Sequence, residues 1–128
     1  MFVDTNVLMY AVGRAHPLRA EARKFFEEAL AGDTPRLCTS AEVLQELMHA
    51  YLPVGRVETL DSALTLAAAC VQEVWPVAGE DVRFARALAD THPELGARDL
   101  LHLACCRRRN VGRVKTFDRT LAAAFKNW

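Results

Sequence analysis

Short apolar segments alternate along this chain with longer amphipathic ones, and this alternation constrains the fold more than any other feature. Four segments have the composition of short β-strands: residues 1–3, 36–38, 74–77 and 113–116. The segments between them are too long for hairpins, so the strands are expected to run parallel through right-handed crossovers. The sequence therefore predicts an α/β fold, a three-layer α/β/α sandwich with a central parallel sheet of four to five short strands.

Helical periodicity is clearest where apolar side chains recur every three or four positions, over residues 18–30 and 57–71. Thr39 and Glu42 have the spacing of a capping box, which predicts a helix from there to about residue 52. Further helices are expected over residues 81–91, 97–109 and 118–125.

Composition narrows the class of protein. The chain has 128 residues, of which 52% are hydrophobic and 25% charged, and this is typical of a single globular domain over residues 1–128. The longest uncharged window, residues 62–72, is too short to cross a membrane, and the first basic residue is Arg14, so no secretory signal is expected. The four cysteines lack CxxC spacing and are predicted to be buried, reduced thiols. Together these features predict a cytoplasmic protein without a membrane span.

Acidic residues follow the predicted strands. Asp4 ends the first strand, Asp118 follows the fourth, and Asp99 lies in the first turn of the helix before it. Glu46 borders the apolar stripe of the helix after the second strand. Ligands of parallel sheets bind beyond the carboxyl ends of the strands, so these acids are expected to share one cleft. Four ionised acids so close together would repel one another, which favours a bound cation, and hard oxygen ligands select Mg²⁺ or Mn²⁺ over zinc.

Each acid also has an ordinary explanation. Asp4 and Asp118 are suited to cap helices, Asp99 to interact with a helix dipole, and Glu46 to face solvent. The side chains of Asn6, Thr5, Ser40 and Thr116 could orient these carboxylates or contact phosphate, and for Thr5 and Ser40 the favoured alternative is simple helix capping.

Histidines offer a different reading of two of these acids. His49 follows Glu46, and His102 follows Asp99, at the three-residue spacing used in di-iron helix bundles. The β-rich segments argue against a bundle of long helices. His102 is therefore expected to be a core residue or to support the site from behind.

Basic residues cluster near the C-terminus. Six lie within thirteen positions: Arg107, Arg108, Arg109, Arg113, Lys115 and Arg119. Such a cluster attracts phosphate, but basic residues at a helix C-terminus also complement the helix dipole. Both readings stay open for the cluster as a whole.

Four motifs, taken in order, resemble the PIN domain family, and most closely its VapC-type toxins. They are VDTN at residues 3–6, TSAEVLQE at residues 39–46, ARDLLHLA at residues 97–104 and TFD at residues 116–118. The resemblance implies a PIN-like, Rossmann-like fold and a metal-dependent ribonuclease, the toxin of a toxin–antitoxin pair. It also implies a homodimer, neutralised by a small cognate antitoxin protein.

The resemblance also implies roles for particular residues. It matches four acids to the family's acidic quartet, Asp4, Glu46, Asp99 and Asp118, and two residues to its polar supporting positions, Asn6 and Thr116. Asp4 and Asp99 are the leading expected ligands of Mg²⁺ or Mn²⁺, with Glu46 and Asp118 completing the site or orienting water. Arg113, Lys115 and Arg119 flank the Asp118 turn and are candidates for binding the RNA backbone.

This chemistry predicts attack by water on phosphorus, leaving 5′-phosphate and 3′-hydroxyl ends on the cut RNA. The alternative function is of a different class: a catalytically silent PIN-like binding module whose acidic edge binds a basic peptide.

Overall fold

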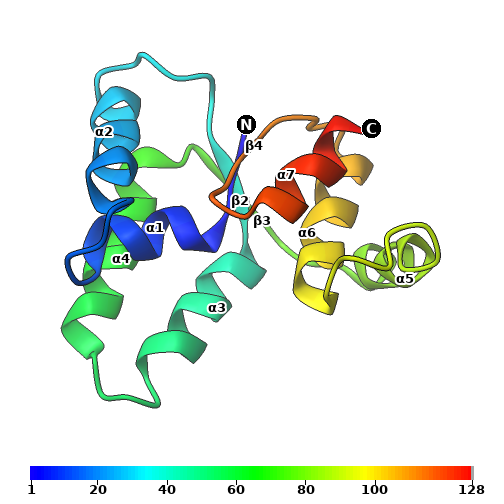
Figure 1. The fold of residues 1–128 in the computed structure, drawn as a ribbon, viewed down its shortest axis with the longest axis horizontal. Helices are drawn as coiled ribbons and strands as arrows, with labels where there is room; N and C mark the ends of the chain where they lie inside the picture. Colours follow the sequence, from blue (N-terminus) through cyan, green and yellow to red (C-terminus); the bar gives the residue numbers. More distant parts are fainter. Residues whose placement is uncertain (128) are drawn as a thin grey trace.

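A four-stranded parallel sheet lies at the centre of the protein, between two groups of helices (Figure 1). The computed structural model describes residues 1–127, and the strands lie in the order β3-β2-β1-β4. In chain order the elements are β1 (Phe2–Val3), α1 (Thr5–Val12), α2 (Arg19–Leu30), β2 (Cys38–Ser40), α3 (Ala41–Tyr51), α4 (Val57–Cys70), β3 (Glu73–Trp75), α5 (Gly79–Leu88), α6 (Ala97–Arg108), β4 (Val114–Lys115) and α7 (Arg119–Lys126). Within the described residues the sheet has no fifth strand.

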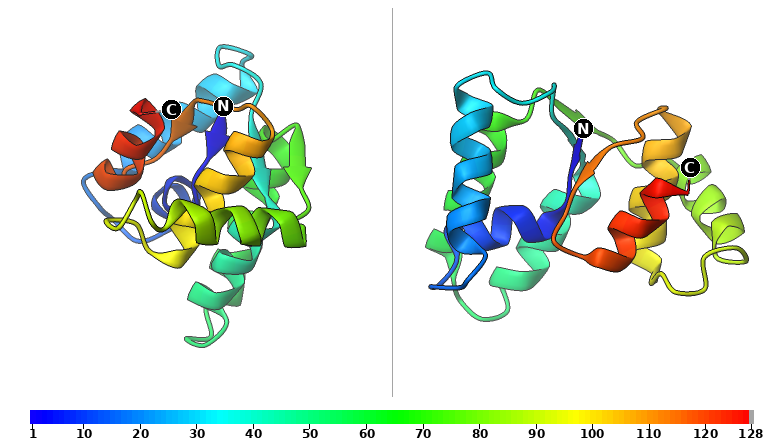
Figure 2. Two further views of the ribbon diagram at one scale, coloured as in Figure 1. Left: turned by 90° about the vertical axis from the view of Figure 1, so that its right-hand side faces the viewer. Right: turned by 45° about the horizontal axis from the view of Figure 1, so that its top comes forward.

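The helices divide into two layers that follow their order in the chain. The first four helices pack on one another at one side of the sheet, whereas α5, α6 and α7 cover the other side (Figures 1 and 2). The central strand β1 is consequently covered on both faces, and its Phe2 and Val3 side chains are fully buried. The predicted three-layer α/β/α architecture is confirmed.

Helix α1 was not among the predicted elements. Its sequence continues the apolar run of β1 almost without a break, so periodicity alone does not separate the two. The boundary is set by Asp4, which has an extended backbone and whose carboxylate accepts a hydrogen bond from the Thr5 backbone N–H.

The predicted capping box at Thr39 is wrong. Thr39 belongs to β2, and its buried hydroxyl donates to the Val3 carbonyl at 2.9 Å, tying β2 to β1. The N-cap of α3 is Ser40, but its side chain forms no capping hydrogen bond, so the expected cap at Ser40 is wrong too. Pairing of Cys38 with Phe2 and with Glu73 places β2 at Cys38–Ser40, two residues later than predicted.

Most residues of the apolar stripes are buried, but individual residues in register with a stripe are exposed. On α3 the buried residues are Val43, Leu47 and Tyr51, whereas Met48 is 44% exposed. At the end of α2, Leu30 is 63% exposed.

A buried ion cluster joins α5 to the end of α6. Asp81 is fully buried and accepts hydrogen bonds from the Ala78 backbone N–H at 2.8 Å and from Arg108 and Arg109. The guanidinium of Arg109 also lies 5.0 Å from the centre of the Trp75 ring. These contacts hold the pKa of Asp81 well below its usual range, because they outweigh the opposing effect of burial. Arg108 and Arg109 are thus occupied within the fold.

The cysteines are all buried free thiols. Over residues 1–127 the structure contains no helix with the length and apolar character needed to cross a bilayer.

Candidate active site

Asp4 lies at the centre of the candidate site, where β1 ends and α1 begins. Its side chain is nearly inaccessible, and both carboxylate oxygens accept hydrogen bonds. One oxygen accepts from the Thr5 backbone N–H at 2.8 Å, and the other accepts from the Thr116 hydroxyl at 2.7 Å. The carboxylate is therefore held in one orientation at the carboxyl edge of the sheet.

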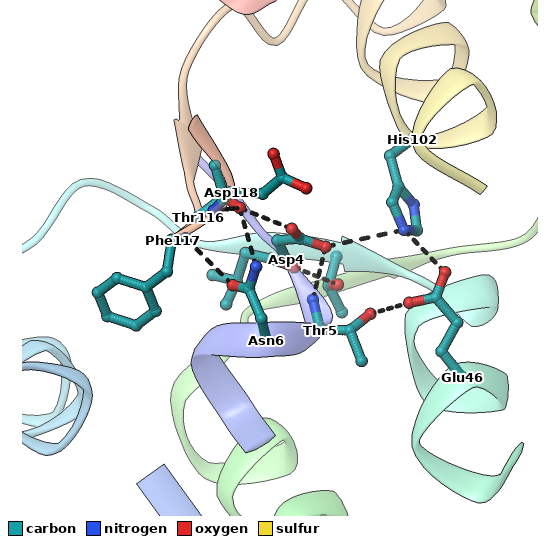
Figure 3. A network of polar contacts seen from close by, with 10 residues as sticks. Asp4, Thr5, Asn6, Glu46, His102, Thr116, Phe117 and Asp118 are labelled. Carbon is teal, nitrogen blue, oxygen red and sulfur yellow. Dashed lines mark hydrogen bonds and ion pairs between the residues drawn. The ribbon is translucent and has the colours of Figure 1, made fainter. Parts of the chain in front are cut away.

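The loop after β4 is tied to the start of α1 through Thr116 and Asn6 (Figure 3). The Thr116 hydroxyl accepts hydrogen bonds from the Asn6 side-chain amide at 3.2 Å and from the Asp118 backbone N–H at 3.0 Å. The Asn6 side-chain oxygen accepts in turn from the Phe117 backbone N–H at 3.2 Å. These bonds place Asp118 beside Asp4, although 114 positions separate them in the sequence.

Asp118 also caps a helix. One of its carboxylate oxygens accepts from the backbone N–H groups of Thr120 and Leu121, at 2.8 and 3.1 Å, at the start of α7. Asp4 caps α1 in the same way. The capping role and the site position that the sequence left as alternatives therefore coexist for both residues.

Glu46 and His102 lie on the other side of Asp4 (Figure 3). The His102 Nε2 atom lies 3.0 Å from a Glu46 carboxylate oxygen and 3.8 Å from an Asp4 oxygen. The second Glu46 oxygen accepts a hydrogen bond from the Thr5 hydroxyl. Glu46 therefore meets the histidine of α6 and not His49 of its own helix, which is exposed, and the di-iron arrangement does not form.

Burial and mutual repulsion shift the pKa values of these acids. Burial, together with the charges of Asp4, Asp118 and Glu46, raises the pKa of Asp99 to about 6. Burial also raises the pKa of Asp4. Burial opposes ionisation of Glu46 as well, but the hydrogen bond and charge of His102 lower its pKa below the usual value. The raised pKa of Asp99 therefore reflects both its burial and its repulsion by the three neighbouring acids.

His102 balances part of this negative charge. Its side chain is 1% exposed, and burial alone would lower its pKa, but the hydrogen bond to Glu46 and the charge of Asp4 raise it above the usual value. A protonated His102 therefore stabilises the ionised forms of Glu46 and Asp4.

Three potential donor atoms lie close together, and the His102 ring nitrogen could bind an ion only in the neutral form of the ring. A carboxylate oxygen of Asp4, one of Glu46 and a ring nitrogen of His102 all lie within 4.8 Å of one another. Asp99 is near enough to this group for the charges of Asp4 and Glu46, and that of Asp118, to raise its pKa. A set dominated by carboxylate oxygens, with one acid kept from full ionisation by its neighbours, fits a hard divalent cation.

Two residues support the acids. Of the two roles considered for Thr5, the favoured one, helix capping, is wrong, and the alternative holds, because its hydroxyl donates to the Glu46 carboxylate. His102 was expected to be a core or supporting residue, and the structure shows it as both. The only sequence signal for Thr5 was its position next to Asp4, and for His102 its spacing from Asp99.

The three basic residues proposed for RNA differ in their surroundings. Arg113 and Arg119 are exposed at the two ends of the segment that carries Asp118. The Lys115 ammonium lies 3.8 Å from a Glu21 carboxylate oxygen, and near the faces of the Phe25 and Phe117 rings. Lys115 is therefore partly neutralised.

Comparison with known proteins identifies the family of this chain. The family model of the PIN domain matches residues 1–126. Ribonuclease VapC23 of Mycobacterium tuberculosis is 64% identical over 127 residues, which cover 99% of both chains. Ribonuclease VapC13 of the same organism is 40% identical over 119 residues, covering 93% of this chain and 90% of that one.

Solved structures share the fold at lower sequence identity. Mycobacterium tuberculosis VapC20, described as a toxin that cleaves the sarcin-ricin loop, has a TM-score of 0.73 at 22% identity and covers 96% of this chain and 93% of its own. A toxin-antitoxin complex from Klebsiella pneumoniae has a TM-score of 0.61 at 19% identity, covering 91% and 85%. With an acidic site at the edge of a parallel sheet and relatives of VapC type along nearly its whole length, the chain belongs to the PIN domain family.

Proposed function

We propose that this protein is the endoribonuclease toxin of a VapC-type toxin–antitoxin pair, and that it hydrolyses RNA phosphodiester bonds with the help of Mg²⁺ or Mn²⁺. The observation that carries the proposal is the electrostatic coupling of Asp99 with Asp4, Glu46 and Asp118 at one edge of the sheet, which together with burial raises the pKa of Asp99 to about 6. The 64% identity to a protein named Ribonuclease VapC23 supports RNA as the substrate.

In this proposal Asp4 and Asp99 are the leading ligands of the metal ion, and Glu46 and Asp118 complete the site or orient water. A divalent cation bound there supplies positive charge to the phosphate oxygens and increases the acidity of water. The fit rests on the carboxylate oxygens grouped around Asp4 and on the repulsion that raises the pKa of Asp99.

The protein's own residues hold the acids in position. The Thr116 hydroxyl orients Asp4, while the Thr5 hydroxyl and His102 each hold one oxygen of Glu46. These contacts lower the pKa of Glu46, so its carboxylate is ionised at neutral pH and is suited to orient an attacking water by accepting a hydrogen bond from it. Helix α6 brings both His102 and Asp99 to this edge, so small movements of α6 would change both sides of the site.

The test is cleavage of single-stranded RNA by the purified protein. We expect cleavage with Mg²⁺ or Mn²⁺, its loss with a chelator, and its return when the metal is restored. The products should carry 5′-phosphate and 3′-hydroxyl ends. A 5′-phosphate-dependent ligase labels such products, but not the 5′-hydroxyl ends that arise together with cyclic phosphates. Products ending in 2′,3′-cyclic phosphate, or cleavage insensitive to chelator, would contradict the proposal.

Arg113, Lys115 and Arg119 form the proposed RNA-binding rim. Each phosphate contact to a single strand contributes about 0.7 to the slope of log affinity against log salt. We expect Arg113→Gln and Arg119→Gln each to reduce this slope by about that amount, and Lys115→Gln to reduce it by less, because Glu21 already lies 3.8 Å from its ammonium. Binding is measured over a salt series, with Arg36→Gln, an exposed arginine before β2, as the control. Unchanged slopes would remove these residues from the rim.

The proposal includes the rest of a toxin–antitoxin system. We propose a small cognate antitoxin as the partner, a homodimer as the assembly and the cytoplasm as the place of action. The antitoxin is supported by the VapC-type relatives and by the Klebsiella neighbour, which is described as a toxin-antitoxin complex.

A further inference from the structure

Three aromatic rings form a ladder that leads from the candidate active site to the surface. Phe117 lies between Thr116 and Asp118, and its ring points away from the carboxylates (Figure 3). The Tyr10 ring, in α1, meets the Phe117 ring edge-on with centres 5.6 Å apart. The His16 ring, in the loop before α2, stacks on Tyr10 with centres 4.4 Å apart and an angle of 30°. We define Phe117, Tyr10 and His16 as the ring ladder.

The ring ladder is held in place by polar contacts at both ends. The Phe117 backbone N–H donates to the Asn6 side chain at 3.2 Å, and the Lys115 ammonium lies 5.4 Å from the centre of the Phe117 ring. At the other end, the Nδ1 atom of His16 accepts a hydrogen bond from the Leu18 backbone N–H at 3.1 Å. The rings are therefore positioned before any ligand binds, which lowers the entropy cost of binding.

The outer end of the ladder is open. Phe117 and Tyr10 are half-buried, whereas His16 is exposed, so one face of its ring is covered by Tyr10 and the other is accessible. A set of rings that served only to fill the core would end on a covered ring. This one ends on a flat, accessible ring.

Positive charge surrounds the exposed ring. Arg14 is exposed in the same loop, and Arg19 begins α2. His16 and Arg19 also line a hollow of about 420 Å³, together with Arg23, Lys24 and one acid, Glu27, so basic residues outnumber acidic ones there. Single-stranded nucleic acids bind in cationic grooves where bases stack on aromatic side chains. An exposed ring set among arginines, two ring contacts from Phe117 beside Asp118, matches that chemistry.

We propose that the exposed face of His16 is a stacking platform for one nucleobase of the single-stranded RNA held in the active site, with Arg14 and Arg19 at the neighbouring phosphate. This inference rests on the proposed function, because it assumes an RNA substrate. It adds a base-binding subsite outside the acidic cluster, on the α1–α2 loop. The subsite recognises the π-face of a base and is therefore tolerant of sequence.

The experiment measures binding of a fluorescein-labelled single-stranded RNA decamer by anisotropy, in the Asp99→Asn background to prevent cutting. We expect His16→Ala to weaken binding about tenfold, and His16→Trp to bind as tightly as histidine or tighter. His92→Ala, a histidine in the loop after α5, is the matched control and should leave affinity unchanged. Thermal melts confirm that the variants are folded.

A second probe identifies the stacked base. The decamer is made with a single abasic nucleotide, moved along its length. With the protein that carries His16, one position of the abasic nucleotide should weaken binding about tenfold relative to intact RNA. With the His16→Ala protein, the same abasic RNA should bind as tightly as intact RNA.

Two results would overturn the inference: His16→Trp binding as weakly as His16→Ala, or an abasic scan that shows no position coupled to His16. Whether the native protein cleaves RNA shows which proposal has failed, the stacking platform or the nuclease function. A native protein that cuts RNA, with a His16→Ala variant that binds it equally well, disproves the platform alone. A native protein that binds RNA through His16 but does not cut it disproves the nuclease and leaves the platform standing.

Discussion

Replacing Asp99 with asparagine is expected to reduce RNA cleavage by at least about 100-fold while making the metal-free protein more stable. Asparagine keeps the shape of the side chain and removes the charge. Catalysis falls because the metal site loses one of its proposed ligands. Stability rises because burial and the charges of Asp4, Asp118 and Glu46 disfavour the ionised form of Asp99 in the folded protein.

The sign of the pH dependence follows from the raised pKa. The unfolded chain releases the Asp99 proton near pH 4, whereas the folded protein holds it to about pH 6. Asp99 therefore destabilises the fold at neutral pH, and this effect disappears as the pH falls below about 4. Allowing for screening by solvent, we expect Asp99→Asn to gain about 1 kcal/mol at pH 7.

Thermal melts with and without Mg²⁺ measure both effects. The native protein should be stabilised by Mg²⁺ at pH 7.5 and much less at pH 5, because below about pH 6 the ion must displace the Asp99 proton. Asp99→Asn should lose most of this metal-linked stabilisation. Asp33→Asn, in the exposed loop after α2, is the control and should behave as the native protein. Metal-linked stabilisation that survives Asp99→Asn unchanged would favour the silent binding module.

Replacing Asp81 with asparagine is expected to cost about 3 kcal/mol of folding free energy and to lower the melting temperature by about 10 °C. Asp81 is fully buried and is the shared acceptor for Arg108 and Arg109, so its loss leaves two guanidinium groups without their carboxylate. This loss of folding free energy is small for a broken buried ion pair. The Arg108 and Arg109 side chains are 35% and 23% exposed, so their guanidinium groups can still contact water.

The same cluster predicts sensitivity to acid. Since the pKa of Asp81 is held below its usual range, its contribution to stability is complete above about pH 4 and is lost as the pH falls through the folded-state value. Urea unfolding at pH 7 and at pH 3 should therefore show a smaller difference for Asp81→Asn than for the native protein. Glu80→Gln, an exposed neighbour that pairs with Arg83, is the control. If the native protein and Asp81→Asn showed the same difference in stability between pH 7 and pH 3, this role of Asp81 would be contradicted.

The four acids of the site were recognisable without coordinates because their positions follow from strand ends. In a parallel sheet the carboxyl ends of the strands meet at one edge, so Asp4 and Asp118 had to approach each other once β1 and β4 were assigned. Glu46 and Asp99 lie on helices next to that edge. Helical periodicity left each of them an ordinary alternative, and the resemblance to the PIN domain motifs singled them out.

The partners of these acids were not recognisable in the same way. Thr5 and Glu46 are 41 positions apart, and His102 and Glu46 are 56 apart, so their hydrogen bonds depend on how α1, α3 and α6 pack. The basic cluster shows the same limit. Arg108 and Arg109 have the same local sequence character as Arg113, but the packing of α5 against α6 directs them to Asp81.

The strand boundaries show the same difference between what local sequence and what tertiary packing determine. Apolar composition located each strand to within about two residues, but hydrogen bonding between neighbouring strands, such as Cys38 to Glu73, decided where β2 begins. Periodicity and strand order act over a few residues, and they determined the layered fold and the four acids. Hydrogen bonds between distant segments determined the orientation of each carboxylate, the Thr5 and His102 contacts and the ring ladder, because a side chain's partner is chosen by packing and not by its neighbours in the chain.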